Sequence, residues 1–310
     1  MTNRIQRFIA FLLVLCIPIF AIAGCTNNDV ANAANQVTTN ANGTYSIDTK
    51  TTTPEGKLDV YMLDIGQGDA ILLKVGDEYS MIDTGDIEHR ENIVAQLKTM
   101  GVTKLKNIII THPHADHMGG FYAIAKAMPI EHVYDDGIAV DNNMYKTYEK
   151  WIEKNKIQRT TLRSGDVVDF GHGAVFIVYA PWVEPLTDKK GETDLNNNSI
   201  VGKLIFGKFS MLFTGDAELQ EEKKLIKEQN SRLFSRILKV GHHGSRTSSS
   251  EDFLKSIKPE SALISNGMYN KYGHPHDVTL RRLQENNIAI YRTDTMGRIH
   301  ISTDGNEWQI

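Results

Sequence analysis

The seven residues from Thr111 to His117 constrain this chain more than any other stretch of its sequence. They read Thr-His-Pro-His-Ala-Asp-His and place His112, His114, Asp116 and His117 within six positions. Imidazole and carboxylate groups together suit zinc, manganese or iron. The first two histidines stand two positions apart, so on an extended segment their side chains leave the same face, while the last two ligand-type residues follow a turn. The spacing predicts two neighbouring metal ions, the arrangement with which two-metal hydrolases activate a water.

The residues around this motif predict where it lies. Asn107 to Ile110 is apolar and β-branched, as in a buried strand. Gly119 and Gly120 form a turn into a helix that begins near Phe121. The motif is therefore expected at the carboxyl end of a strand, held by rigid structure and open to solvent.

A carboxylate stands at the end of a second apolar strand. Phe209 to Phe213 runs into Thr214-Gly215-Asp216, and a charged helix follows from Glu218 to about Gln229. Asp216 is a helix-capping residue in one interpretation and a carboxylate that bridges both metal ions in the other, which the first motif favours. Asp116 and Asp216 are thus the predicted catalytic residues.

Histidines stand at the end of a third apolar strand, where Ile237 to Val240 is followed by Gly-His-His-Gly-Ser. His242 is predicted to bind the second ion together with Asp116, His117 and Asp216, and His243 competes closely for that role. The spacing does not separate the two firmly.

The residues after this motif suggest a substrate contact. Ser245, with Arg246 and Thr247, precedes a helix for which Ser248 and Glu251 form a capping-box pattern. A helix N-terminus is a natural place for a substrate anion, although a solvated loop fits these residues equally well.

Three other histidines receive weaker assignments. His274, in a polar loop from Asn266 to His276, is expected to face the site as an outer ligand or a substrate donor. His276 precedes a helix and is expected at the surface. His172, between Gly171 and Gly173, is interpreted as a turn residue.

The first 56 residues are predicted to lie outside the folded domain. Residues 1–24 resemble a bacterial lipoprotein signal peptide, with Arg4 and Arg7 before an apolar run. Cys25 follows Ala23-Gly24, where a lipidated cysteine is expected. Residues 25–56 are poor in large apolar side chains and are predicted to be a flexible tether. Residues 57–310 form the domain, so we expect an exported protein anchored by lipid at the outer face of the cytoplasmic membrane.

Composition limits the chemistry of that domain. The only two cysteines are Cys16 and Cys25, so sulfur ligands and disulfides are excluded from the domain and the metals, zinc or manganese, need nitrogen and oxygen donors. The chain has a formal net charge of −4, and the predicted signal carries two bases and no acid, so the remainder is more acidic still. This balance counts against extensive nucleic-acid binding, although bound metals add local positive charge.

The order of these motifs resembles the metallo-β-lactamase superfamily over roughly Leu58 to the C-terminus. The pieces Leu63 to Ala70, Leu238 to Ser245 and Tyr272 to His276 further resemble the extracytoplasmic hydrolase domain of ComEC competence proteins. The resemblance implies an α+β fold in which two packed β-sheets are flanked by helices, an αββα sandwich with a two-metal site at one edge.

Two departures from the family pattern affect the first metal. The ComEC branch often has Asp where this chain has His114, and many superfamily members have His near Asn198. The resemblance then implies His112, His114 and Asp216 as ligands, completed by water or Asn198, with an open coordination position that catalysis needs.

The resemblance implies hydrolysis of phosphodiester bonds, with DNA as the leading substrate. One alternative is an esterase that acts on cell-wall phosphodiesters, similar to phosphorylcholine esterases, or on other small esters. The non-enzyme alternative is a metal-stabilised surface binding module. A β-lactamase fits less well, because the resemblance lies on a different branch. The membrane is the expected partner through the lipid, and no feature indicates an obligate protein partner.

Overall fold

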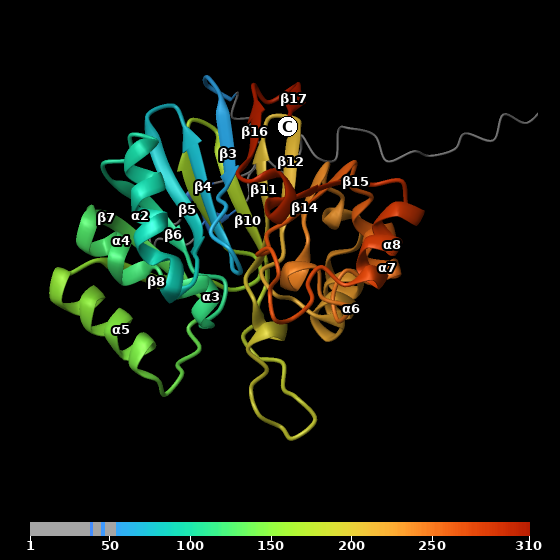
Figure 1. The fold of residues 1–310 in the computed structure, drawn as a ribbon, viewed down its shortest axis with the longest axis horizontal. Coiled ribbons are helices and arrows are strands. Elements are labelled where there is room, and N and C mark those ends of the chain that lie inside the picture. Colours follow the sequence, from blue (N-terminus) through green and yellow to red (C-terminus); the bar gives the residue numbers. More distant parts are fainter. Residues whose placement is uncertain (1–37, 40–44, 47–53) are drawn as a thin grey trace, which may run out of the picture.

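Two β-sheets pack face to face, and helices cover the outer face of each (Figure 1). The computed structural model describes residues 38–39, 45–46 and 54–310. The predicted α+β sandwich of two packed sheets flanked by helices is confirmed.

The first sheet contains eight strands among the described residues. In spatial order they are β17 (Trp308–Gln309), β16 (Ile299–Thr303), β3 (Leu58–Met62), β4 (Ala70–Val75), β5 (Glu78–Thr84), β6 (Leu105–Ile109), β7 (Ile130–Asp135) and β8 (Gln158–Thr161). β3, β4 and β5 are antiparallel, as their short glycine-rich turns predict, and β5 to β8 run parallel.

The second sheet contains seven strands in the same part of the chain. In spatial order they are β15 (Ala289–Arg292), β14 (Ser261–Ile264), β13 (Ile237–Lys239), β12 (Phe209–Phe213), β11 (Val201–Phe206), β10 (Ala174–Ala180) and β9 (Val167–Gly171). β12 to β15 are parallel and the others antiparallel.

Helices connect the parallel strands. In the described part of the chain the α-helices are α2 (Arg90–Thr99), α3 (Ala115–Met118), α4 (Phe121–Ala127), α5 (Asn143–Asn155), α6 (Leu219–Gln229), α7 (Glu251–Ile257), α8 (Asp277–Glu285) and α9 (Thr293–Met296). Short 3-10 helices are η1 (Ile87–His89), η2 (Asn196–Asn198), η3 (Asn230–Leu233) and η4 (Gly241–Gly244). None of the described helices is long and apolar enough to cross a membrane.

Three apolar layers hold the sandwich together. The central layer lies between the sheets and includes Phe176, Phe206, Phe209 and Phe213, all almost fully buried. A second layer joins the first sheet to α2, α4 and α5, and a third joins the second sheet to α6, α7 and α8. Burial on this scale, at roughly 25 cal/mol per Å² of apolar surface, is the main stabilising contribution to the fold.

The structure describes part of the segment predicted as a tether, residues 25–56. Two short strands in it, β1 (Thr38–Thr39) and β2 (Tyr45–Ser46), pair antiparallel with each other. The backbone N–H of Glu55 donates a hydrogen bond to the carbonyl of His172. The predicted signal peptide, residues 1–24, and Cys25 lie outside the described residues.

Two local predictions differ from the structure. The helix after the Gly-His-His-Gly-Ser motif is capped by Ser250, whose hydroxyl accepts from the backbone N–H of Phe253, whereas Ser248 was expected. Ser248 instead donates to the carbonyl of Ala217. Strand β8 was not predicted, because its sequence Gln-Arg-Thr-Thr is polar and mostly exposed. His172 does occupy a turn, with φ of 49°.

The sheet topology places the three ligand-bearing segments at one edge. β12 and β13 are parallel neighbours, so the segments after them leave the second sheet together. The first motif follows β6 of the facing sheet, and the backbone N–H of Ile200, just before β11, donates to the carbonyl of Thr111. This hydrogen bond joins the two sheets beside the motif.

Candidate metal centre

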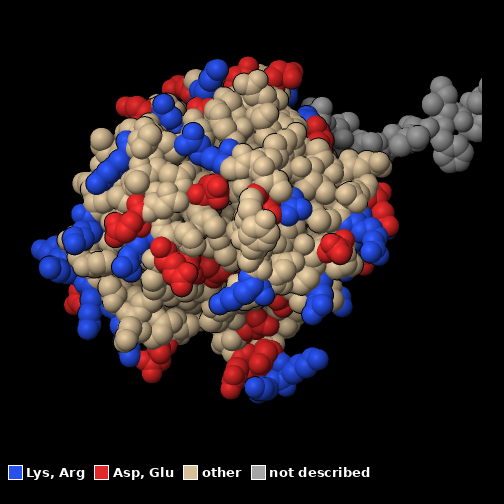
Figure 2. All heavy atoms as spheres, in the orientation of Figure 1, with Lys and Arg blue, Asp and Glu red and all other residues tan. Residues whose placement is uncertain are grey.

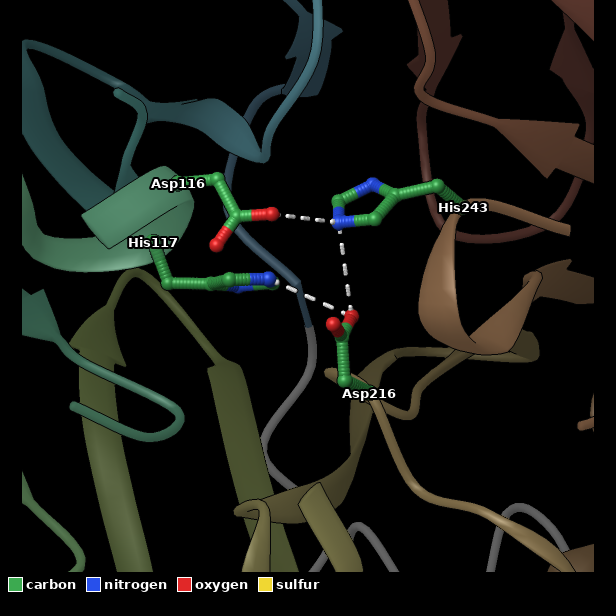
Figure 3. A group of neighbouring side chains, drawn as sticks. All are labelled: Asp116, His117, Asp216 and His243. Carbon is green, nitrogen blue, oxygen red and sulfur yellow. Dashed lines mark ion pairs between the residues drawn. The ribbon is translucent and has the colours of Figure 1, made fainter. Parts of the chain in front are cut away.

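Four side chains from three separate segments point toward one another at this edge (Figure 3). Asp116 and His117 lie on α3, Asp216 lies in the turn after β12, and His243 lies on η4. One ligand atom from each lies within 4.8 Å of the others. Such a group has the size and the donor types of a divalent-metal site.

The shortest distances in the cluster run through Asp216 and His243. Oδ1 of Asp216 lies 3.2 Å from Nε2 of His117 and 3.6 Å from Nε2 of His243. The same nitrogen of His243 lies 3.2 Å from Oδ2 of Asp116. The four atoms therefore surround one point in space.

Three of these atoms are buried and have no hydrogen-bond partner within the described part of the chain. They are Nε2 of His117, Nε2 of His243 and Oδ1 of Asp216. Buried polar atoms are nearly always hydrogen-bonded, so three unpaired ones that face a common point need a ligand. A divalent cation fits this donor set.

The second oxygen of Asp216 faces a different group of histidines. Oδ2 lies 3.7 Å from Nε2 of His242 and 3.9 Å from Nε2 of His112. That nitrogen of His112 lies 3.0 Å from Nδ1 of His114. Asp216 thus stands between two sets of histidines, with one carboxylate oxygen toward each.

The structure places His243 in the position for which the sequence favoured His242. Both residues have left-handed backbone conformations, with φ of 48° for His242 and 52° for His243. This backbone turns their side chains apart, so that the ring of His243 enters the buried cluster and the ring of His242 lies at its partly exposed rim.

Buried hydrogen bonds fix the rings of the inner histidines. Nδ1 of His117 donates to Oδ2 of Asp83 over 2.8 Å, and that carboxylate also accepts from the backbone N–H and the hydroxyl of Thr111. Nδ1 of His243 donates to the carbonyl of Ser265 over 2.9 Å. In both rings Nε2 is left to face the cluster, which is how metal-binding histidines are usually oriented.

A buried ion pair lies beneath the cluster. The ammonium group of Lys239 contacts Oδ2 of Asp69, and both side chains are 1% exposed. Oδ1 of Asp69 lies 3.5 Å from Nδ1 of His243. The turn that carries this aspartate is held to α3, because its backbone N–H donates to the carbonyl of Asp116. A Cβ on Gly68, whose φ is 125°, would lie 2.5 Å from that carbonyl oxygen.

Burial and neighbouring charges separate the pKa values of the histidines. Burial, with help from His117, holds the pKa of His112 well below 6.5. Burial also disfavours charge on His117 and His243, but Asp216 and its neighbouring carboxylates outweigh it. They raise the pKa of His117 well above 6.5 and that of His243 to about 10. Positive charge is therefore stabilised at the point where the four ligand atoms converge.

Of the remaining candidate residues, His274 lies at the mouth of the cluster, whereas Asn198 and Ser245 do not. His274 lines a hollow of about 360 Å³ at the mouth of the cluster, together with His114, His242 and Tyr272. Burial and the charges of His243 and His242 lower its pKa to about 4, so its ring is neutral at physiological pH.

Asn198 and Ser245 do not reach that hollow. The side-chain oxygen of Asn198 accepts from the backbone N–H of Leu186, and its amide donates to the carbonyls of Leu186 and Asp194. The hydroxyl of Ser245 lies 2.9 Å from that of Thr247. At the position where many family members have a histidine, the side chain of this protein thus holds a loop in place by hydrogen bonds.

Sequence reasoning missed several residues of the site. They are Gln67 and Asn196 in the lining of the hollow and Asp69, Asp83 and Lys239 beneath it. Two signals were present. Asp69 follows Gly68 and Asp83 stands two residues before Gly85, each near the end of a strand, and the lysine is the one charged residue in the run Ile237 to Val240.

A sandwich of two sheets with outer helices and a histidine–aspartate cluster at one edge defines a class of metal-dependent proteins. Residues 63–267 match the family model of the metallo-beta-lactamase superfamily. The chain therefore belongs to the metallo-beta-lactamase superfamily, whose members are mostly metal-dependent hydrolases. A solved structure, the metallo-beta-lactamase fold protein YhfI from Bacillus subtilis, covers 79% of this chain and 100% of its own, with a TM-score of 0.55. At 11% identity it shows the shared fold alone.

Similar curated proteins include a competence protein. The chain is 30% identical over 247 residues to Competence protein ComA of Neisseria gonorrhoeae, covering 79% of this chain and 32% of that protein. It is 29% identical over 264 residues to ComE operon protein 3 of Bacillus subtilis (strain 168), covering 79% and 33%. The chain thus spans about a third of the length of these relatives.

Proposed function

We propose that this chain is a two-metal phosphodiesterase and that DNA is its leading substrate. The observation that carries the proposal is the placement of Asp216, whose two carboxylate oxygens face two separate sets of histidines. A single structural metal would need only one set. A carboxylate shared between two sets suits a pair of ions.

Each ion then has its own set of ligands, with Asp216 common to both. Asp116, His117 and His243 would hold the ion on the Oδ1 side. His112, His114 and His242 would hold the ion on the Oδ2 side. His242 would supply the ligand that Asn198 cannot, because the amide of that asparagine is hydrogen-bonded to a loop.

Bound divalent ions in this arrangement supply an activated water and polarise a phosphoryl oxygen. The protein's own residues supply orientation. Asp83 holds the ring of His117, and the carbonyl of Ser265 holds that of His243. His274 contacts the substrate at the mouth, because Nδ1 of its neutral ring has no hydrogen-bond partner within the described residues.

The choice of phosphodiester substrate rests on the competence relatives and on the resemblance to the hydrolase domain of ComEC proteins. These relatives are named for competence, and the matching portion is about a third of their length. A cell-envelope phosphodiester is the substrate to consider next if DNA is not cleaved.

The test uses the purified full-length chain loaded with zinc or manganese. Metal content is measured by elemental analysis, and hydrolysis is followed with single-stranded DNA, double-stranded DNA and bis(p-nitrophenyl) phosphate. We expect two ions per chain and DNA cleavage. Asp116→Ala should lose metal and turnover, whereas Asp77→Ala, which removes a carboxylate with 98% side-chain exposure, should change neither. His243→Ala and His242→Ala should each lose one ion.

Three other outcomes would contradict the proposed substrate, the proposed catalysis or the number of ions. Hydrolysis of small esters or cell-wall polymers without DNA cleavage would identify the envelope esterase. Bound metal without hydrolysis of any ester would identify a binding module, and a metal content of one ion, unaffected by His242→Ala, would contradict the two-ion assignment.

We also propose that the protein is exported and anchored by a lipid on Cys25. The charged and apolar pattern of residues 1–24 and the small residues before the cysteine support this location. Cys25→Ser should move the protein from the membrane fraction to the soluble fraction. Unchanged fractionation would contradict the anchor.

A further inference from the structure

A groove of about 890 Å³ lies beside the metal centre, and five of the side chains that line it are cationic. We call it the basic groove and define it by Lys223, Lys224, Lys227, Arg246 and Arg282. The lysines lie on α6, Arg246 lies in the loop before α7, and Arg282 lies on α8. These helices cover one outer face of the second sheet, to the lower right in Figure 1.

Three of these cations make no ion pair with any described residue. Within the part of the chain that the structure describes, no carboxylate lies within ion-pair distance of Lys223, Lys227 or Arg246, and all three are exposed. Long cationic side chains that make no ion pair within the fold are available to bind an external anion.

The other two cations are tied to the fold. Lys224 lies over the ring of Trp182, 4.2 Å from its centroid, and pairs weakly with Glu228. Arg282 donates to the carbonyl of Ser248 over 3.1 Å. They form part of the walls of the groove and add two positive charges to its lining.

The two carboxylates that line the groove are already engaged. Glu218 accepts from Nδ1 of His242 and from the hydroxyl of Thr247, each over 2.9 Å. Glu228 pairs with Lys224. The groove therefore carries a local excess of positive charge in a chain whose formal net charge is −4. Elsewhere, on the face shown in Figure 2, basic and acidic side chains are interspersed.

The groove is separated from the hollow of the metal centre by a single layer of side chains. Glu218 and Thr247 line the groove, and both contact His242, whose Nε2 faces Asp216. A substrate chain that lies along the groove would therefore be separated from the metal ligands by only one side chain. The hollow at the metal centre, at about 360 Å³, is less than half as large.

We propose that the basic groove binds the backbone phosphates of a linear phosphodiester chain and leads that chain to the metal centre. This inference rests on the proposed phosphodiesterase activity and adds the path of its substrate. Separated lysines and an arginine along a groove match repeating phosphates, whereas a single small phosphate would engage only one end. Contacts of this kind bind without regard to sequence and weaken as salt is raised.

The test measures binding without cleavage. The full-length chain, kept metal-free with chelator, is titrated against a fluorescent 20-nucleotide single strand over a range of salt. The groove variant is Lys223→Glu/Lys227→Glu. The matched control is Lys98→Glu/Lys126→Glu, which reverses two exposed lysines around another hollow, on α2 and α4. Lys223→Gln/Lys227→Gln provides a milder form of the same test.

We expect the groove variant to lose affinity by about tenfold or more near 0.1 M salt and to lower the slope of log K against log salt by about 1.4, as two lost contacts to a single strand predict. The control variant should lose much less affinity for the single strand. Equal losses in both variants, or no binding by the unaltered chain, would overturn the proposal.

Two further arms identify the ligand and separate the two proposals. Displacement of the strand by poly(glycerol phosphate) as well as by unlabelled DNA would show that the groove accepts phosphodiester chains in general, and displacement by DNA alone would restrict it to nucleic acid. Hydrolysis of bis(p-nitrophenyl) phosphate by the unaltered, metal-loaded chain tests the catalytic proposal independently, because that substrate is too small to span the groove.

Discussion

Replacing Lys239 with methionine tests whether the ion pair beneath the metal centre is needed for the fold. The lysine contacts Asp69 and donates to the carbonyl of Gly215 over 3.1 Å. Methionine fills a similar volume but carries no charge. The variant therefore leaves the carboxylate of Asp69 almost fully buried without its cation.

The size of the effect follows from the burial of the pair. Burial would raise the pKa of Asp69, but Lys239, with help from His243, lowers it from 3.8 to about 2. At about 1.4 kcal/mol per tenfold change, this corresponds to roughly 2 kcal/mol of stabilisation. It is fully present above pH 3.8 and is lost as the pH falls toward 2. Breaking a buried pair typically costs about 3–5 kcal/mol.

Thermal unfolding at pH 7 measures the loss. For a domain of this size about 2 °C of Tm corresponds to 1 kcal/mol, so Lys239→Met should lower Tm by about 5–10 °C. The matched control is Lys203→Met. Lys203 is also buried, but it donates to the carbonyls of Arg232 and Phe234 rather than to a carboxylate, and burial lowers its pKa to about 8. Because burial already disfavours the charge on Lys203, its removal should change Tm much less than Lys239→Met does.

If Lys239→Met shifts Tm by no more than Lys203→Met, the pair does not stabilise the fold. A double variant, Asp69→Asn/Lys239→Met, should recover part of the loss, because it removes the unpaired charge. If the double variant recovers no stability, altered packing and not the unpaired charge of Asp69 causes the loss in Lys239→Met.

Two other substitutions probe the surroundings of the site. Asp83→Asn removes the carboxylate that orients His117 and should weaken metal binding about 10- to 100-fold, measured by competition with a chelator; equal affinity in Asp83→Asn and Asp77→Asn would contradict this role. Burial, together with Asp194 and Glu222, raises the pKa of Glu221 well above 4.5. The native state therefore binds its proton more tightly, and stability falls as pH rises above 4.5. Glu221→Gln should raise Tm by about 2–4 °C at pH 8 and by less near pH 4; a constant difference would contradict it.

The sequence predicted the frame of the site because strand ends carry strong local signals. Largely apolar runs end at Ile110, Phe213 and Val240, and within three residues each is followed by glycine, histidine or aspartate. A short apolar run is consistent with a buried strand even when the strands that pair with it are unknown. The convergence of these ends at one edge required the sheet order, which came with the family resemblance.

The sequence could not predict features that depend on backbone direction or on long-range contacts. Asn198 was an open candidate because the family resemblance implies a ligand near its position, yet its amide is held by a loop twelve residues earlier in the chain. The contact between Lys239 and Asp69 joins residues 170 positions apart. Strand β8 has no apolar alternation, because it lies at the end of its sheet and is mostly exposed.

The two adjacent histidines show how backbone strain can carry functional information. Left-handed conformations in residues other than glycine cost about 1–3 kcal/mol each, and His242 and His243 both adopt them. Hydrogen bonds to Glu218 and to Ser265 fix the two rings in different directions. A glycine at either position would relieve the strain but remove a ring from one side of Asp216. The strained pair is therefore best explained if both histidines act, one toward each oxygen of that carboxylate.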